Sequence, residues 1–141
     1  QQTIAVSHTT EDKLAFVFNL SLDEEETELS IKKDNDLVSL DVRTHHYLTV
    51  LLARYRMQDM QQGVDEHIQG WVTLKQLAKD LGLSENHINI QIHRARKQFV
   101  EHMNHQFAQT LIERKRGQVR FGSQRFKIYK GQNVETSPAL L

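Results

Sequence analysis

The sequence predicts an α+β fold, in which an N-terminal antiparallel β-sheet precedes three helices and a C-terminal β-hairpin. Apolar and polar residues alternate over residues 13–42, which is the period of strands with one buried face. Over residues 43–103 apolar residues recur every three or four positions, which is the period of amphipathic helices. Residues 111–130 return to short alternating runs around two glycines, and this pattern favours a hairpin.

The length and composition fit one domain. The chain has 141 residues, of which 38% are hydrophobic and 26% charged, and this is enough to bury a core. We assign the domain to residues 13–130 and expect flexible tails at 1–12 and 131–141, which lack a hydrophobic pattern. Because the first residue is Gln1 and not methionine, we expect a fragment whose upstream signalling domain is missing.

Targeting signals are not apparent in the sequence. No apolar run approaches the roughly 18 residues of a membrane span, and the first residues do not resemble a signal peptide. The chain has no cysteine, which excludes disulfides and thiolate metal sites and suits a reducing compartment. We therefore expect a cytoplasmic protein that does not contact membranes.

Three short strands are predicted within residues 13–42. The first has an alternating apolar set, and "TELSI" at 27–31 and "LVSLDV" at 37–42 come after it. The polar stretches "DEEE" and "KKDND" separate the three strands and indicate turns. We expect an antiparallel meander whose buried residues in the first strand are Leu14, Phe16, Phe18, Leu20 and Leu22.

Three helices are predicted within residues 43–103. The first covers about 16 residues from Thr44, and the polar loop 61–70 comes after it. Thr73 is suited to cap the second helix, which Gly82 ends, and Ser84 is suited to cap the third helix, at 84–103. We expect Trp71, which lies between this loop and the second helix in the sequence, to anchor the core.

The stretch "HINIQIHRARKQF" at 87–99 is ambiguous, because its isoleucines alternate as they would in a strand. At about 100° per residue, however, an apolar set falls within one narrow arc over four turns. That set is Ile88, Ile92, Ala95, Phe99 and Met103. The stretch is therefore predicted to be helical, with Ile90 on the opposite face among Asn86, His93, Arg94 and Lys97.

The formal net charge is zero, but the charges are distributed unevenly. Residues 1–42 contain ten acidic residues and three lysines, whereas residues 43–141 contain fifteen Lys and Arg against eight acids. Such asymmetry indicates a polyanion-binding half. Mutual attraction between the two halves is the alternative.

A helix pair with a basic hairpin after it favours binding to duplex DNA. In a helix-turn-helix the first helix braces the second, which enters the major groove. Arg94 and Lys97 are suited to phosphates or guanine edges, Asn86 to adenine and Ile90 to a thymine methyl group. A basic hairpin adds backbone or minor-groove contacts. The predicted DNA-binding residues are Asn86, Asn89, Ile90, His93, Arg94 and Lys97 in the helix, and Arg114, Lys115, Arg116, Arg120 and Arg125 in the hairpin.

These features together resemble the OmpR/PhoB-type winged-helix DNA-binding domain, the effector domain of many bacterial response regulators. "INIQIHRARKQF" is similar to the recognition helix of that family, and "ERKRGQVRFGSQRF" to its glycine-containing basic wing. The resemblance covers residues 13–130. It implies a winged helix-turn-helix that acts in transcription regulation, with RNA polymerase or a second protomer as further partners.

The chain departs from the family pattern in two places. Its wing, Arg116 to Phe121, lacks the second glycine and the tyrosine of the family, and the loop 61–70 is extended. That loop is where family members meet polymerase or a neighbouring protomer. The segments "RTHHYLTVLLARYR" and "QGWVTLKQLAKDLGLSENHINIQIHRARKQF" are also similar to winged-helix regions after forkhead-associated domains in some bacterial proteins, which implies a phosphothreonine-recognising domain upstream.

Other classes of function have weaker support. The sequence contains no Gly-rich phosphate loop, no Gly-x-Ser-x-Gly and no HExxH, so we expect neither an enzyme nor a cofactor or metal site. His45 and His46 are expected in the first turn of the first helix. The main alternative to DNA binding is a winged-helix module that binds a protein, and it is favoured by Ile90 on the exposed face and by the zero net charge.

Overall fold

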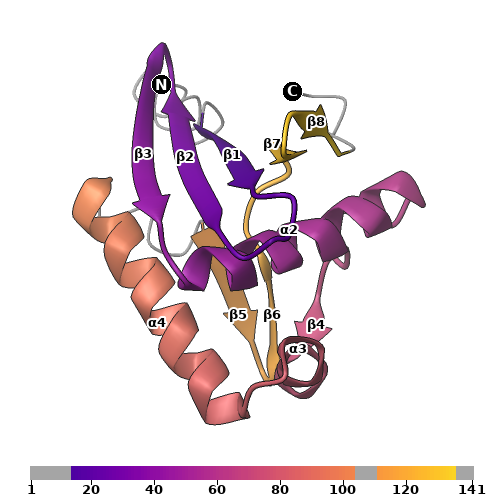
Figure 1. Cartoon of the computed structure of the whole chain (residues 1–141). Helices are drawn as coiled ribbons and strands as arrows, with labels where there is room; N and C mark the ends of the chain where they lie inside the picture. Colours follow the sequence, from indigo (N-terminus) through magenta and orange to yellow (C-terminus); the bar gives the residue numbers. More distant parts are fainter. Residues whose placement is uncertain (1–13, 104–110, 136–141) are drawn as a thin grey trace, which may run out of the picture.

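The computed structural model describes residues 14–103 and 111–135, and over these residues the fold is α+β, with three helices and two sheets (Figure 1). The predicted tail at 1–12 and the last part of the other predicted tail, at 136–141, lie outside the described residues. No helix among those described has the length and hydrophobicity that crossing a bilayer requires. The elements are β1 (Leu14–Leu20), β2 (Thr27–Lys33), β3 (Asp36–Val42), α2 (His45–Gln61), β4 (Val72–Thr73), α3 (Leu74–Leu81), α4 (Glu85–His102), β5 (Ile112–Lys115), β6 (Gln118–Phe121), β7 (Phe126–Lys130) and β8 (Asn133–Val134).

The predicted N-terminal meander is confirmed. β1 pairs antiparallel with β2, and β2 pairs antiparallel with β3, within a sheet of order β3-β2-β1-β7-β8. Phe16 and Phe18 of β1 are fully buried, as the alternation predicted. Leu22 was wrongly placed in the core: it is 73% exposed, because the chain has already turned at Ser21, whose N–H donates to the Glu26 carbonyl.

The C-terminal strands are divided between the two sheets, which corrects the prediction of one hairpin over 111–130. Within 111–130 only β5 and β6 pair as a hairpin, with its turn at Arg116 and Gly117, and β6 also pairs with β4. β7 comes after this hairpin in the sequence and pairs parallel with β1, which buries Phe126 and Ile128. The strand that pairs with β7 is therefore far from it in the sequence.

The predicted tail at 131–141 is wrong for residues 131–135. Asn133 and Val134 form β8, which pairs antiparallel with β7. Glu135 then forms an ion pair with Arg54 of α2, and Arg54 also pairs with Glu24 in the turn after β1. These pairings attach residues 131–135 to the sheet and to α2.

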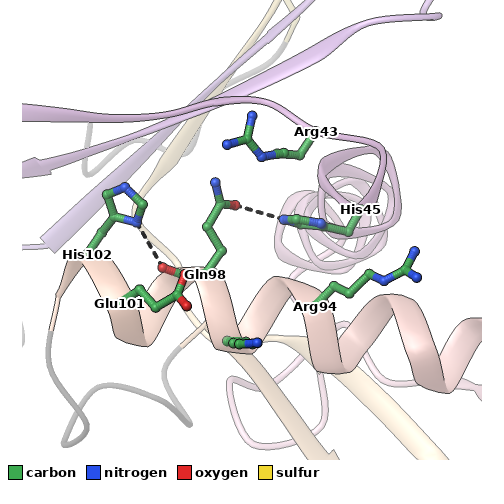
Figure 2. Close-up of a pocket in the computed structure, with 7 residues that line it drawn as sticks. Arg43, His45, Arg94, Gln98, Glu101 and His102 are labelled. Atoms are coloured by element: carbon green, nitrogen blue, oxygen red, sulfur yellow. Dashed lines mark hydrogen bonds between the residues drawn. The ribbon is translucent and has the colours of Figure 1, made fainter.

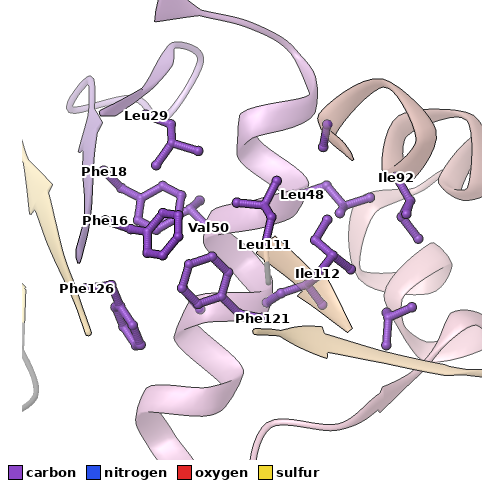
Figure 3. Packing of buried hydrophobic residues seen from close by; sticks show 14 of the residues in the cluster. Phe16, Phe18, Leu29, Leu48, Val50, Ile92, Leu111, Ile112, Phe121 and Phe126 are labelled. Atoms are coloured by element: carbon purple, nitrogen blue, oxygen red, sulfur yellow. The ribbon is translucent and has the colours of Figure 1, made fainter. Parts of the chain in front are cut away.

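A cluster of aromatic rings joins the two sheets (Figure 3). The Phe121 ring of β6 contacts Phe16 and Phe18 of β1 at centroid distances of 5.2 and 5.6 Å, and Phe126 of β7 at 5.4 Å. All three contacts are edge-on, the arrangement that aromatic quadrupoles favour. The second sheet is thereby fixed to the first sheet.

A buried arginine holds the loop between α2 and β4. Arg56 of α2 donates to the Gln69 side-chain oxygen at 2.9 Å and to the Phe121 carbonyl at 2.8 Å. Burial lowers the pKa of Arg56 to about 10, so its guanidinium stays charged at neutral pH. Gly70 lies directly against it, and an added Cβ there would be 2.8 Å from the Arg56 Cβ.

We expect Gly70→Ala to lower the free energy of unfolding by about 2 kcal/mol, measured by urea denaturation. About 1 kcal/mol comes from the left-handed backbone, where φ is +78°, and about 1 kcal/mol more from crowding against Arg56. Gly63→Ala is the matched control, since φ is +75° there and nothing lies within 4 Å of the added Cβ. Equal losses in the two variants would contradict a packing role for Gly70.

Candidate nucleic-acid interface

The helix pair is capped as the sequence predicts. Thr73 accepts a hydrogen bond from the Gln76 N–H at the start of α3, and Gly82 ends that helix with a φ of 67°. Ser84 accepts a hydrogen bond from the His87 N–H at the start of α4. Both helices are thus delimited by local side-chain and backbone geometry, and only residues 82–84 separate them.

The helix α4 has one buried face and one exposed face, which confirms the helical interpretation of its sequence. Its buried apolar residues are Ile88, Ile92, Ala95 and Phe99. Ile90 is 40% exposed on the other face, and Asn89 is half-buried. The remaining predicted contact residues of the helix are all exposed: Asn86, His93, Arg94 and Lys97.

A buried polar network fixes α4 against the rest of the fold, and Figure 2 shows its bond between Gln98 and His45. The Gln98 side-chain oxygen accepts a hydrogen bond from His45 Nε2 at 2.8 Å, and its nitrogen donates to the Leu40 carbonyl at 2.7 Å. His46 Nε2 donates to the same carbonyl at 3.0 Å. Since Leu40 belongs to β3 and the histidines to α2, Gln98 connects α4 to both elements. The two histidines lie at the start of α2, as predicted.

The β5–β6 hairpin is joined to α4 by two arginine side chains. Arg114 of β5 donates to the Asn89 side-chain oxygen, and Arg96 of α4 donates to the Ile112 carbonyl. The first bond is between two predicted DNA-contact residues, one from the helix and one from the hairpin. The exposed face of α4 and the outer face of β5 therefore form one surface.

Three of the five predicted hairpin residues are exposed, and the first of them is bonded to this helix face: Arg114, Lys115 and Arg116. The side chain of Arg120 is bonded to other residues of the protein, which corrects its assignment as a free contact residue. Its side chain forms an ion pair with Glu113 and donates to the Glu66 and Gln69 carbonyls. Arg125 lies between β6 and β7, so it belongs neither to the strands nor to the turn of the β5–β6 hairpin.

Trp71 is a half-buried surface ring, and its prediction as a core anchor is wrong. The Lys115 Nζ lies 4.3 Å from the centroid of the ring, and the Arg120 guanidinium carbon lies 4.7 Å from it. The indole thus supports two hairpin cations through its π face. It stabilises the hairpin from the loop side.

The acidic "DEEE" turn is a structural feature. Glu24 forms ion pairs with Arg54 and Lys130, and the hydrogen bond from Arg54 lowers the pKa of Glu24 to about 2. Tyr47 also donates to this carboxylate. The described residues contain no group of three or more His, Asp or Glu side chains placed to hold a metal ion.

Arg43, between β3 and α2, lies near the helix face but was not predicted as a site residue. Together with Arg94 and Lys97 it lines a pocket beside the polar network. Its immediate sequence neighbours, Val42 and Thr44, carry no charge, so only the packing of α2 against α4 reveals its position. Comparisons of the chain with protein-family models, with curated proteins and with solved structures found no match.

Proposed function

We propose that residues 14–135 include a winged helix-turn-helix that binds duplex DNA sequence-specifically, as the effector domain of a bacterial transcription regulator. The bond from Arg114 to Asn89 is the observation that carries this proposal, because it joins the exposed helix face to the basic hairpin. The capped α3–α4 pair and the β4-β6-β5 sheet beside it support the same assignment.

In this proposal α4 lies in the major groove. Within the described residues Arg94 and Lys97 take part in no ion pair, so their charges are available to phosphates or guanine edges. Ile90 offers an apolar contact of the kind that a thymine methyl group makes. Arg114, Lys115 and Arg116 supply the hairpin contacts to the backbone or minor groove.

The test is a fluorescence-anisotropy titration of random duplex DNA at several salt concentrations. We expect binding at low salt whose log affinity falls with log salt at a slope of about −4.5, since roughly five exposed cations face the DNA. Circular dichroism of the same samples confirms that the protein is folded. A folded protein that does not bind at low salt would contradict the proposal.

Binding of a partner protein is the second candidate. Ile90 is 40% exposed, and the edge strand β3 exposes Leu37 at 66% and Val42 at 49%. Exposed apolar side chains at a sheet edge favour pairing with another chain. The same titration separates the two functions, because such an edge gives no affinity for DNA and no dependence on salt of the kind above.

A further inference from the structure

A pocket of about 230 Å³ lies where the junction between β3 and α2 meets the C-terminal half of α4. Arg43 comes from the junction, His45 from the first residue of α2, and the other lining residues from α4 (Figure 2). Those residues are Arg94, Lys97, Gln98, Glu101 and His102. The wall formed by His45 and Gln98 is rigid, because both side chains are buried and bonded to each other.

Positive charge is in excess in this pocket. Arg43, Arg94 and Lys97 face a single carboxylate, that of Glu101. The pairing of Arg43 with Asp41 is long, at 3.6 Å, and both side chains are about half exposed, so it is weak. Burial lowers the pKa of His45, and the nearby positive charges of Arg43 and Arg94 act in the same direction.

The start of α2 adds to this positive potential. The helix has 17 residues, its cap residue Thr44 provides no side-chain hydrogen bond, and its first turn contains no acidic residue. The positive end of the helix dipole is therefore not neutralised by a side chain. Anions bind favourably at such helix starts when cationic side chains lie beside them.

We propose that this pocket binds a phosphate group between Arg43 on one side and Arg94 and Lys97 on the other. In a DNA complex the group is a backbone phosphate next to the segment read by α4, and this part of the inference rests on the proposed function. Binding of free phosphate does not depend on it. Arg43 is then a phosphate contact that belongs to neither the recognition helix nor the hairpin.

Inorganic phosphate tests the pocket directly. The amide resonances of the whole chain are followed by NMR during a phosphate titration, with sodium chloride at the same ionic strength as the reference. We expect shifts at residues 43–46 and at Lys97 to Glu101 that Arg43→Ala abolishes and Lys32→Ala, an exposed charge on β2, retains. Glu101→Gln removes the opposing carboxylate and is expected to tighten binding.

If phosphate induces no shifts, or if the shifts are unchanged in Arg43→Ala, the proposed phosphate pocket is wrong.

A second experiment measures the binding of Arg43→Ala to duplex DNA of random and of varied sequence. We expect weaker binding to every sequence and a salt slope reduced by about 1, as for a single phosphate contact. If the protein binds DNA and this slope is unchanged, the backbone-phosphate assignment is wrong. If phosphate binds the pocket but DNA does not bind, the proposed function fails and the pocket stands.

Discussion

Replacing Arg94 and Lys97 together by alanine is expected to weaken binding to duplex DNA about 100-fold. Each charged side chain that hydrogen-bonds to a phosphate or to a base edge contributes about 1.5 kcal/mol, so a combined loss of about 3 kcal/mol corresponds to that factor. The fold should be unaffected, because both side chains are exposed and form no ion pair within the described segments. Alanine also has the highest intrinsic helix propensity.

A second double variant controls for the loss of charge alone. Lys32→Ala with Lys127→Ala removes two positive charges from β2 and β7 of the five-stranded sheet. We expect this variant to bind DNA nearly as well as the parent chain, because its charges are not on the α4 surface. If both double variants bind with the parent's affinity at moderate salt, α4 is not the recognition helix.

The exposed face of α4 was predictable from the sequence because it depends on local periodicity. Ile88 and Ile92 are buried and Ile90 is exposed, as the rotation of 100° per residue requires. The caps at Thr73 and Ser84 were predictable for the same reason, since each depends on residues three positions apart.

The features that the sequence did not predict depend on contacts between distant segments. A strand pattern over 126–130 does not show whether that strand joins its neighbours or β1, and the structure pairs it with β1. Arg120 has the sequence context of a basic hairpin, yet its ion pair with Glu113 and its bonds to the Glu66 and Gln69 carbonyls remove it from the contact surface. Arg43 enters the site only because α2 packs against α4.

Acidification from pH 7 to pH 4.5 is expected to destabilise the protein by about 2.5 kcal/mol through His46 alone. Burial lowers the pKa of His46 from its ordinary value of 6.5 to about 4. Between these values the unfolded chain binds a proton that the folded chain does not, so lowering the pH favours unfolding. The stabilisation is complete above pH 6.5 and is lost as the pH falls to about 4, at about 1.4 kcal/mol per unit.

The burial of His46 and its unpartnered Nδ1 explain why protonation is unfavourable. The Leu40 carbonyl can only accept, so Nε2 carries the proton of the neutral ring. Nδ1 is buried and has no hydrogen-bond partner among the described residues. A second proton would therefore place a charge and an unsatisfied donor in the core, with the His45 ring 4.6 Å away.

Urea denaturation at a series of pH values from 7 to 4.5 measures this effect. This range lies above most of the titration of Glu24. The pKa of Glu24 is lowered from its ordinary value of 4.5 to about 2, so this carboxylate changes the stability mainly below pH 4.5. His46→Gln retains an N–H donor for the Leu40 carbonyl but does not titrate, so its stability should depend less on pH. His67→Gln, at an exposed position, is the control and should behave like the parent.

The slope of the free energy of unfolding against pH distinguishes His46→Gln from His67→Gln, even if His46→Gln is less stable at every pH. A slope in His46→Gln as steep as in the parent would assign the acid sensitivity to other groups.

Because the Leu40 carbonyl also accepts a hydrogen bond from Gln98, protonation of His46 acts on the network that holds α4. DNA binding is then expected to weaken over the pH range in which the network opens, although the phosphates of the DNA do not titrate there.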